Sequence, residues 1–263
     1  MNKLDLNNKP SYKQVFKKMF SIKEDAASHE EIKTRILSGG QITGTNMIVM
    51  VCAILIASVG LNTDSVAVII GAMLISPLMG SILAMAYGTV SNDGGLAGRH
   101  AMGFAIQIII SVAVAILYFT ISPVKDPTDQ LMARTSPRFF DVIIATAGGI
   151  AGIVGQTRQE KFNNIIPGVA IATALMPPLC TCGYSIANGE WRMLIGAAYL
   201  FVINAYFIYM SSCFILAILK IPQTNEMTPA DRRKLNRKMI RNTIVVLLPM
   251  ILIVIHLAKT QSF

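Results

Sequence analysis

The sequence predicts an all-α polytopic membrane protein with about seven transmembrane helices, arranged as an inverted 3+3 repeat with broken second and fifth helices plus one C-terminal helix. Of the 263 residues, 53% are hydrophobic and 14% are charged, and the mean hydropathy is +0.56. Soluble domains typically carry about 25% charged residues, so the composition predicts that the lipid bilayer surrounds this chain. Two mutually similar apolar stretches that contain prolines predict the repeat.

Seven apolar segments are candidates for membrane spans. They cover approximately residues 44–61, 66–90, 101–121, 139–155, 165–186, 194–219 and 240–257. A transmembrane helix needs about 20 mainly apolar residues, so one bundle accounts for most of the chain and no second soluble domain is expected. The fourth segment is short and rich in glycine, which is typical of a helix that packs closely against its neighbours.

The repeat becomes visible when residues 163–189 are moved back by 101 positions onto residues 62–88. Without any gap, eight of 27 positions are identical, where about two are expected from ordinary residue frequencies. The identical pairs are Asn62/Asn163, Val68/Val169, Ile70/Ile171, Leu74/Leu175, Pro77/Pro178, Leu78/Leu179, Ala86/Ala187 and Gly88/Gly189. The same shift places the first three apolar segments on the next three. Because each copy then has an odd number of spans, the second copy would enter the membrane from the opposite face, which makes the repeat inverted. Chance similarity between two apolar stretches is the alternative.

The domain organisation follows from these segments. Residues 1–41 are expected to form a basic cytoplasmic tail with a short amphipathic helix at residues 11–20. Residues 42–263 are expected to form the transmembrane domain. This domain is expected to contain repeat one (44–121), repeat two (145–222) and an extra helix (229–257).

Local signals place several helix ends. Ser28 and Glu31 have the spacing of a capping box. The two glycines at residues 39–40 form a natural stop for the helix that follows Ser28. Thr228 can cap the last helix, which is expected to kink near Pro249.

Basic residues are distributed unevenly between the two ends of the predicted spans. With seven spans, 18 of the 23 Lys and Arg residues fall on the side of the N-terminal tail and five on the other side. Cytoplasmic loops carry the excess of basic residues, so the chain is expected in the cell (inner) membrane with its N-terminus cytoplasmic. This distribution accounts for the net charge of +9, and no nucleic-acid partner is expected.

Two motifs carry a family resemblance. GAMLISPLMG at residues 71–80, preceded by NTDS at residues 62–65, and PGVAIATALMPPL at residues 167–179 resemble the signature stretches of the membrane family called domain of unknown function 389. The resemblance covers roughly residues 44–220. It implies a hydrophobic multi-span protein of a bacterial and archaeal family without an established activity.

Prolines inside the second and fifth segments are the main functional signal. A proline in mid-helix lacks the backbone donor and frees a carbonyl one turn earlier, which persists at bilayer depth only against protein or water. Pro77 would free the carbonyl of Met73. Pro178 would free the carbonyl of Ala174, with Pro177 preventing a second bond. The full set expected at this midplane site is Met73, Ser76, Pro77, Thr173, Ala174, Pro177, Pro178 and Thr181. The alternative is a pair of simple kinks that neighbouring helices reseal.

Polar residues stand where each broken segment begins. They are Asn62, Thr63, Asp64, Ser65, Asn163 and Asn164. Side-chain oxygens at such positions can cap helix N-termini, and this role alone would account for them. The functional alternative is a polar mouth that leads to the break. Asp64 is the only carboxylate of the group, and ionisable groups next to a membrane path are functional candidates.

Enzymatic and metal-binding functions have little support. The three histidines, His29, His100 and His256, are scattered along the chain, so no metal or acid–base cluster is expected. The chain contains no G-x-S-x-G, H-E-x-x-H or Walker motif. All four cysteines lie in apolar runs, where they act as small hydrophobic residues. We expect no cofactor and no catalytic reaction.

The sequence therefore predicts a transporter or channel for a small solute or ion, with its site at the two proline-broken helices. The alternative is a non-transporting membrane scaffold or sensor that uses the basic tail for signalling. A homo-oligomer is expected because the glycine-rich fourth segment and the long sixth segment offer more packing surface than seven spans need.

Overall fold

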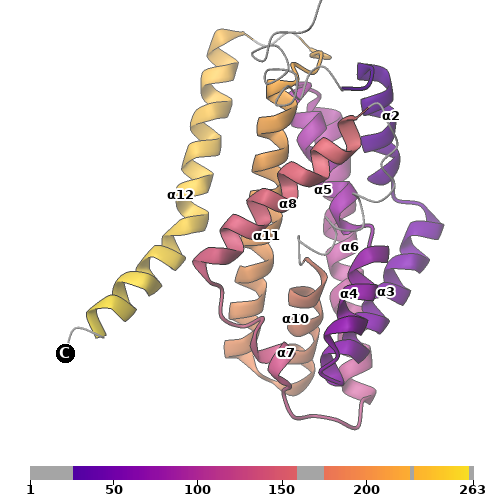
Figure 1. The fold of residues 1–263 in the computed structure, drawn as a ribbon, viewed down its shortest axis with the longest axis vertical. Coiled ribbons are helices and arrows are strands. Elements are labelled where there is room, and N and C mark those ends of the chain that lie inside the picture. Colours follow the sequence, from indigo (N-terminus) through magenta and orange to yellow (C-terminus); the bar gives the residue numbers. More distant parts are fainter. Residues whose placement is uncertain (1–25, 159–174, 226–227, 261–263) are drawn as a thin grey trace, which may run out of the picture.

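The structure is a computed structural model, which describes residues 26–158, 175–225 and 228–260, apart from the side chains of residues 232, 234, 250 and 252–260. Within these ranges the chain forms long helices, and its β structure is an isolated bridge between Ala26 and Arg158 (Figure 1). The helices are α2 (His29–Gly39), α3 (Gly44–Asn62), α4 (Val66–Ile75), α5 (Leu78–Val90), α6 (Gly94–Ile121), α7 (Asp129–Met132), α8 (Phe139–Thr157), α10 (Met176–Asn188), α11 (Trp191–Ile218) and α12 (Pro229–Thr260).

Four helices of the described chain are long and apolar enough to cross a membrane, namely α3, α6, α8 and α11. The pair α4 and α5 makes a fifth crossing if it is counted as one span with a bend of 44°. The chain is thus a helical, multi-pass membrane protein. The seven spans of the prediction are not all found. The fifth one, at residues 165–186, falls largely outside the described residues, and α10 contains its end.

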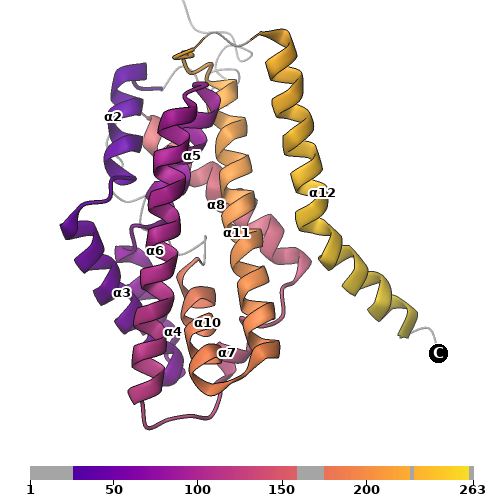
Figure 2. The ribbon, with the colours of Figure 1, turned by 180° about the vertical axis from the view of Figure 1, so that it is seen from behind.

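The local helix signals agree with the observed ends. The Glu31 amide donates to Ser28 Oγ over 3.3 Å at the start of α2, and the helix ends at Gly39 with Gly40 as its C-cap. The Asp231 amide donates to Thr228 Oγ1 over 3.2 Å at the start of α12. Helix α12 contains Pro249 and bends away from the bundle along its length (Figures 1 and 2). These ends depend on residues within one turn, which explains why sequence reasoning finds them.

The helices before and after residue 122 match in length and in packing. Helices α3 and α8 have 19 residues each, α5 and α10 have 13 each, and α6 and α11 have 28 each. Helix α5 packs on both α6 and α11, and α10 packs on both α11 and α6. The chain runs in opposite directions along the two members of each pair, as the colours of Figure 1 show.

Two buried apolar clusters form the core. The larger one joins α3, α4, α5, α6, α10 and α11 and includes Ile54, Leu78, Phe119 and Tyr184. The second one lies where α2 meets the bundle, and it contains Ile32 and Ile36 of α2. Helix α2 is therefore packed on the transmembrane bundle. Residues 1–25 of the expected tail, including the amphipathic helix predicted at residues 11–20, lie outside the described residues.

A backbone contact between glycines fixes α2 against α5. A Cβ atom added to Gly80, in the first turn of α5, would overlap the carbonyl group of Gly39. A Cβ atom on Gly40 would lie 2.6 Å from that of Ala84. His100 Nδ1 of α6 lies 3.1 Å from the Gly40 carbonyl oxygen. The end of α2 thus touches α5 three residues after Pro77.

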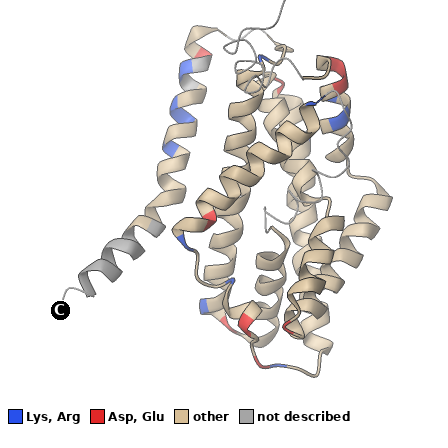
Figure 3. Ribbon diagram, in the orientation of Figure 1, with Lys and Arg blue, Asp and Glu red and all other residues tan. Residues whose placement is uncertain are grey.

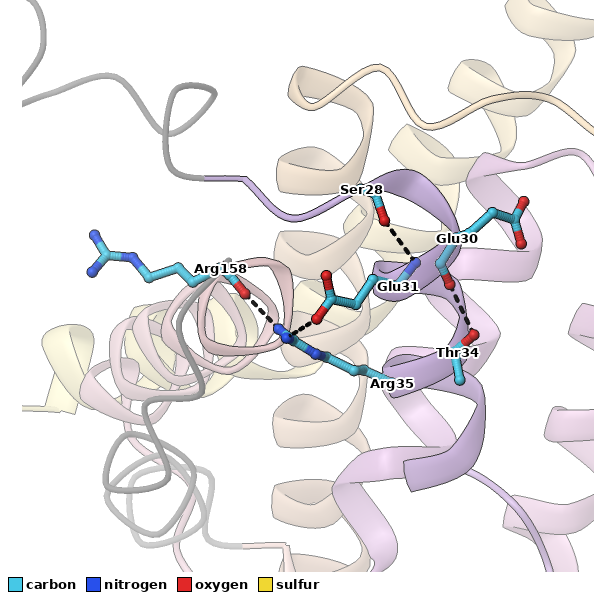
Figure 4. A network of polar contacts seen from close by, with 6 residues as sticks. All are labelled: Ser28, Glu30, Glu31, Thr34, Arg35 and Arg158. Atoms are coloured by element: carbon cyan, nitrogen blue, oxygen red, sulfur yellow. Dashed lines mark hydrogen bonds and ion pairs between the residues drawn. The ribbon is translucent and has the colours of Figure 1, made fainter.

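Hydrogen bonds also connect α2 to the end of α8 (Figure 4). Arg35 forms an ion pair with Glu31 and donates to the carbonyl oxygen of Arg158. The amide of Ala27 donates to the carbonyl of Thr157 over 2.8 Å. Residues 26–40 consequently lie against both repeats of the predicted transmembrane domain.

Charged residues of the described chain lie mainly near the ends of the long helices and along the first turns of α12 (Figure 3). The buried polar side chains of the described residues are Ser58, Asn62, Ser81, Ser91, Gln107, Ser111, Ser122, Thr157, Thr181, Ser185, Asn204, Ser211 and Ser212. They carry hydroxyl or amide groups and no ionisable group. Large apolar side chains such as Ile109 and Phe214, which are 67% and 63% exposed, face outward. This distribution suits a protein surrounded by lipid.

Replacing Gly80 with alanine should destabilise the protein by about 1–3 kcal/mol, because the new methyl group has to push Gly39 away. The matched control is Gly71→Ala in α4, where a Cβ atom meets nothing within 4 Å. The control should be neutral or stabilise by up to about 1 kcal/mol, because alanine favours the helix. Thermal unfolding in detergent measures both variants. Equal melting temperatures would show that α2 is not held at Gly80.

Candidate functional site

The second predicted span is interrupted at Ser76 and Pro77. Helix α4 ends at Ile75 and α5 begins at Leu78, with an angle of 44° between them. Ser76 adopts an extended conformation, with φ −72° and ψ 128°. A residue that precedes proline is disfavoured in the helical region, and proline cannot donate to the carbonyl one turn earlier. The local sequence therefore accounts for the break.

The backbone groups freed by this break find weak local partners. Pro77 has no amide hydrogen to donate to the Met73 carbonyl, and this carbonyl accepts the Ser76 amide over 3.4 Å instead. The Leu78 amide donates to Ser76 Oγ over 3.4 Å, and the Gly80 amide donates to the Pro77 carbonyl over 3.1 Å. Bonds of 3.4 Å are at the long end of the range for hydrogen bonds. The break is closed by long bonds that a better partner can replace.

The second short helix also begins at prolines, but one turn earlier than the 101-residue shift predicts, since Met176 corresponds to Ile75. Helix α10 starts at Met176, so Pro177 and Pro178 lie in its first turn. Proline is tolerated there because the first amides of a helix have no partner within it. Thr181 Oγ1 donates to the Pro177 carbonyl over 2.9 Å, so its own helix occupies this hydroxyl. The other expected site residues of this copy, Asn163, Asn164, Thr173 and Ala174, lie outside the described residues.

Asn62 and Thr63 terminate α3 instead of capping α4. Asn62 is buried, and its Nδ2 donates to Ser122 Oγ over 2.6 Å and to the Tyr118 hydroxyl over 3.4 Å at the end of α6. Its Oδ1 is buried and has no partner among the described residues. Thr63 Oγ1 donates to the Val59 carbonyl over 2.9 Å. Ser65 is the N-cap residue of α4 but makes no side-chain capping bond.

Asp64 holds the turn between α3 and α4. Its φ of +54° places it in the left-handed region, and the Ser65 amide bonds back to the Gly60 carbonyl over 2.8 Å, as in a Schellman motif. Asp64 Oδ1 accepts the Gln130 amide over 3.0 Å in the first turn of α7. Thr128 Oγ1 donates to the Leu61 carbonyl over 2.6 Å beside it. Asp64 thus has a structural role at one end of the bundle, where it joins the loop between α6 and α8.

Sequence reasoning did not single out the buried hydroxyls of Ser81 and Ser111. Ser81 of α5 donates to Gln107 Oε1 of α6 over 2.9 Å. Ser111 of α6 is fully buried, and its hydroxyl has no partner among the described residues. An unpaired buried hydroxyl costs about 1–3 kcal/mol, so water or a solute would stabilise it. Serines are common in packed membrane helices, and no signal in the sequence distinguished this one.

Besides Asp64, charged groups lie in the loop between α6 and α8 and in the first turn of α8. Burial lowers the pKa of the Arg134 guanidinium, and the neighbouring Asp141 carboxylate opposes part of this effect. Asp141 Oδ2 accepts the Arg138 amide over 2.6 Å at the start of α8. Within the described ranges, no group of three His, Cys, Asp or Glu residues is arranged to hold a metal ion. The arrangement can offer amides, carbonyls and hydroxyls to a ligand.

Comparisons with known proteins support the resemblance seen in the sequence. The family described as "Domain of unknown function (DUF389)" matches residues 73–210, from the break in the second span to the second half of α11. The chain is 28% identical over 189 residues to an uncharacterised protein of Methanocaldococcus jannaschii. This similarity covers 72% of the chain and 58% of that relative. No solved structure matches.

Replacing Asp64 with asparagine should leave the melting temperature nearly unchanged, because asparagine tolerates the left-handed conformation and its carbonyl can accept the Gln130 amide. Asp64→Ala should destabilise by about 1–2 kcal/mol, because alanine is strained at positive φ and loses the bond to Gln130. Thermal unfolding of the two variants separates these effects. A large loss in the asparagine variant would mean that the negative charge itself is required.

Proposed function

The chain belongs to the domain of unknown function 389 family, and we propose that it is an integral membrane transporter or channel for a small solute or ion. The proposed path passes the starts of the short helices α5 and α10. The proposal assigns no catalytic reaction, cofactor or metal ion to the chain.

One observation carries this proposal. Helices α5 and α10 have the same length, and each begins at prolines inside the bundle. Leu78 and Met176, the first residues of the two helices, are both 1% exposed and belong to the same buried cluster. Helix ends expose backbone groups that need partners, and transporters use interrupted helices of this kind as binding sites at the bilayer midplane.

An inverted repeat is part of the proposal. It would relate α3, α5 and α6 to α8, α10 and α11. Equal helix lengths, opposite chain directions and the packing of each short helix on the long helix of the other half all support it. The expected consequence is a site near the pseudo-two-fold axis that both halves share.

The chemistry of the break favours a small, uncharged solute or an ion held by backbone dipoles. Carbonyls at the end of α4 offer partial negative charge, and amides at the start of α5 offer partial positive charge. The buried polar side chains of the described residues add hydroxyls and amides without a permanent charge. Such a site lacks the buried carboxylate that a proton relay would use.

A non-transporting scaffold or sensor is the second candidate. It is favoured by the docking of α2 beside the break, through the Gly39–Gly80 contact. A signal that displaces α2 would then reach α5 directly. A homo-oligomer, expected from the packing surfaces of α8 and α11, stays a prediction for either function.

Cysteine accessibility in proteoliposomes tests the path, in a variant whose native cysteines are replaced. Ser76→Cys should react with 2-aminoethyl methanethiosulfonate roughly tenfold faster than two controls, because the reagent needs a thiolate in water. The first control is Leu74→Cys, at a lipid-facing position that is 40% exposed. The second is Ser212→Cys, at a fully buried position whose hydroxyl is bonded to the Ile208 carbonyl of its own helix. A rate at Ser76→Cys equal to that of both controls would contradict a water-filled path to the break.

The proposal also places the end that carries α2 on the cytoplasmic side of the cell membrane, because most basic residues lie there. Lys33→Cys on α2 should be labelled by an impermeant maleimide only after the cells are opened. Asp126→Cys, in the loop at the other end, should be labelled in intact cells. Both side chains are exposed, so the reverse pattern would show the opposite orientation.

A further inference from the structure

A cavity of about 710 Å³ lies between α11, α12 and the end of α5. Its walls are mainly apolar and include Phe214 and Ala217 of α11 and Leu235 and Met239 of α12. The volume falls within the range of small-molecule sites, which is about 300–1,000 Å³. The cavity is separate from the break at Pro77.

The polar rim of this cavity consists of donors and amides. Lys220, Gln223 and Asn236 are among the lining residues, and none of the lining residues carries a carboxylate. Asp231, which belongs to the same region, is bonded to the hydroxyl of Thr228 over 2.7 Å. The rim therefore offers a positive charge and neutral hydrogen-bonding groups, which complement an anion.

Lys220 occupies a position where glycine would be less strained. It follows the C-cap of α11 with φ +55°. Its amide bonds to the Ala217 carbonyl over 3.1 Å, and the Ile221 amide bonds to the Leu216 carbonyl over 3.4 Å. This is a Schellman motif, whose left-handed residue is usually glycine. The lysine costs backbone strain at this point, and it is one of the residues that line the cavity.

The loop that carries Lys220 is fixed on the neighbouring turn. Asn92 Nδ2 donates to the Asn225 carbonyl over 3.1 Å, and Asn225 Nδ2 donates to the Asn92 carbonyl over 2.9 Å. The Thr224 amide donates to the Ser91 carbonyl over 2.7 Å. These bonds hold the rim at one place relative to the apolar walls.

The order of groups along the cavity matches that of a phospholipid. Lys220 lies just beyond the end of α11, and Met210 lines the cavity ten residues earlier, which corresponds to about 15 Å along a helix. Arg233, Arg237 and Lys238 are exposed on the first turns of α12. Charged residues near the end of α11 and on the first turns of α12 thus lie next to an apolar slot between these two helices.

We propose that this cavity binds a phospholipid with an anionic headgroup. The phosphate lies at Lys220 with Gln223 and Asn236 as further partners, and one acyl chain fills the apolar slot between α11 and α12. Basic pockets at the cytoplasmic ends of transmembrane helices bind such lipids. The lipid would also add to the contact between α11 and α12. In this contact the hydroxyls of Tyr199 and Tyr206 on α11 donate to the carbonyls of Val246 and Met239 on α12.

Native mass spectrometry of the full chain in detergent tests this proposal with two lipids of identical acyl chains, palmitoyl-oleoyl phosphatidylglycerol and palmitoyl-oleoyl phosphatidylcholine. The wild-type protein should retain one phosphatidylglycerol per chain with a preference of roughly fivefold, as expected for one lysine near the headgroup. Lys220→Gly should remove the preference. This variant relieves the backbone strain, so loss of folding cannot explain the result.

Two further variants define the site. Ala217→Phe fills the slot and should reduce the retention of both lipids, with the melting temperature reporting whether the protein is folded. Lys33→Gln on α2 removes one positive charge at the same end of the molecule, away from the cavity, and should behave like the wild type. An unchanged preference in Lys220→Gly would overturn the proposal. The proposal would also be overturned if Phe214→Cys formed a disulfide between two copies of the chain and retained no lipid, because a second copy would then occupy the cavity.

Discussion

Close approach of helix backbones at glycines holds this bundle together. Lipid surrounds the protein, so burial of apolar surface gives little advantage to helix association, and tight packing of small residues has to provide it. Gly183 of α10 lies so close to Ala115 of α6 that an added Cβ atom would overlap the methyl group of Ala115. A Cβ atom on Gly149 of α8 would lie 2.8 Å from the Ile208 Cα of α11. The first contact joins helices on either side of residue 122, and the second joins α8 to α11, which are separated in the chain by α10.

This packing allows short helices to end inside the bundle. Helix α10 has 13 residues, which are too few to cross a bilayer, yet most of them are buried. The polar side chains near its start bond within the helix: Thr181 with the Pro177 carbonyl, and Ser185 with the Thr181 carbonyl over 2.7 Å. Such bonds satisfy the hydroxyl groups, and Pro177 and Pro178 have no amide hydrogen, so the first turn of α10 presents few backbone donors. The starts of α5 and α10 both lie in the larger buried cluster, and this is the physical reason to look for a ligand there.

Features that depend on neighbouring residues could be predicted from the sequence. The capping of α2 by Ser28, its end at Gly39 and the interruption of the second span at Pro77 all follow from local rules. The docking of α2 on Gly80 could not be predicted, because a pair of glycines that ends a helix carries no information about its tertiary partner. The role of Asp64 depends on α7, a four-residue helix with too little sequence pattern to detect. Lys220 was missed because lysine gives no signal for a left-handed conformation.

The contact between α2 and α5 links the two candidate functions. The backbones of Gly39 and Gly80 have no space between them, so a rotation of α5 about the break at Pro77 has to carry α2 along or separate the two glycines. Helix α2 is also bonded to the end of α8 through Arg35 and Ala27. Motion at the break therefore changes contacts at the end of the molecule where most of the described basic residues lie (Figure 3). In a transporter built in this way, any partner that holds α2 would change the motion of α5 at the break. In a sensor, the same coupling would carry a change at the break to α2.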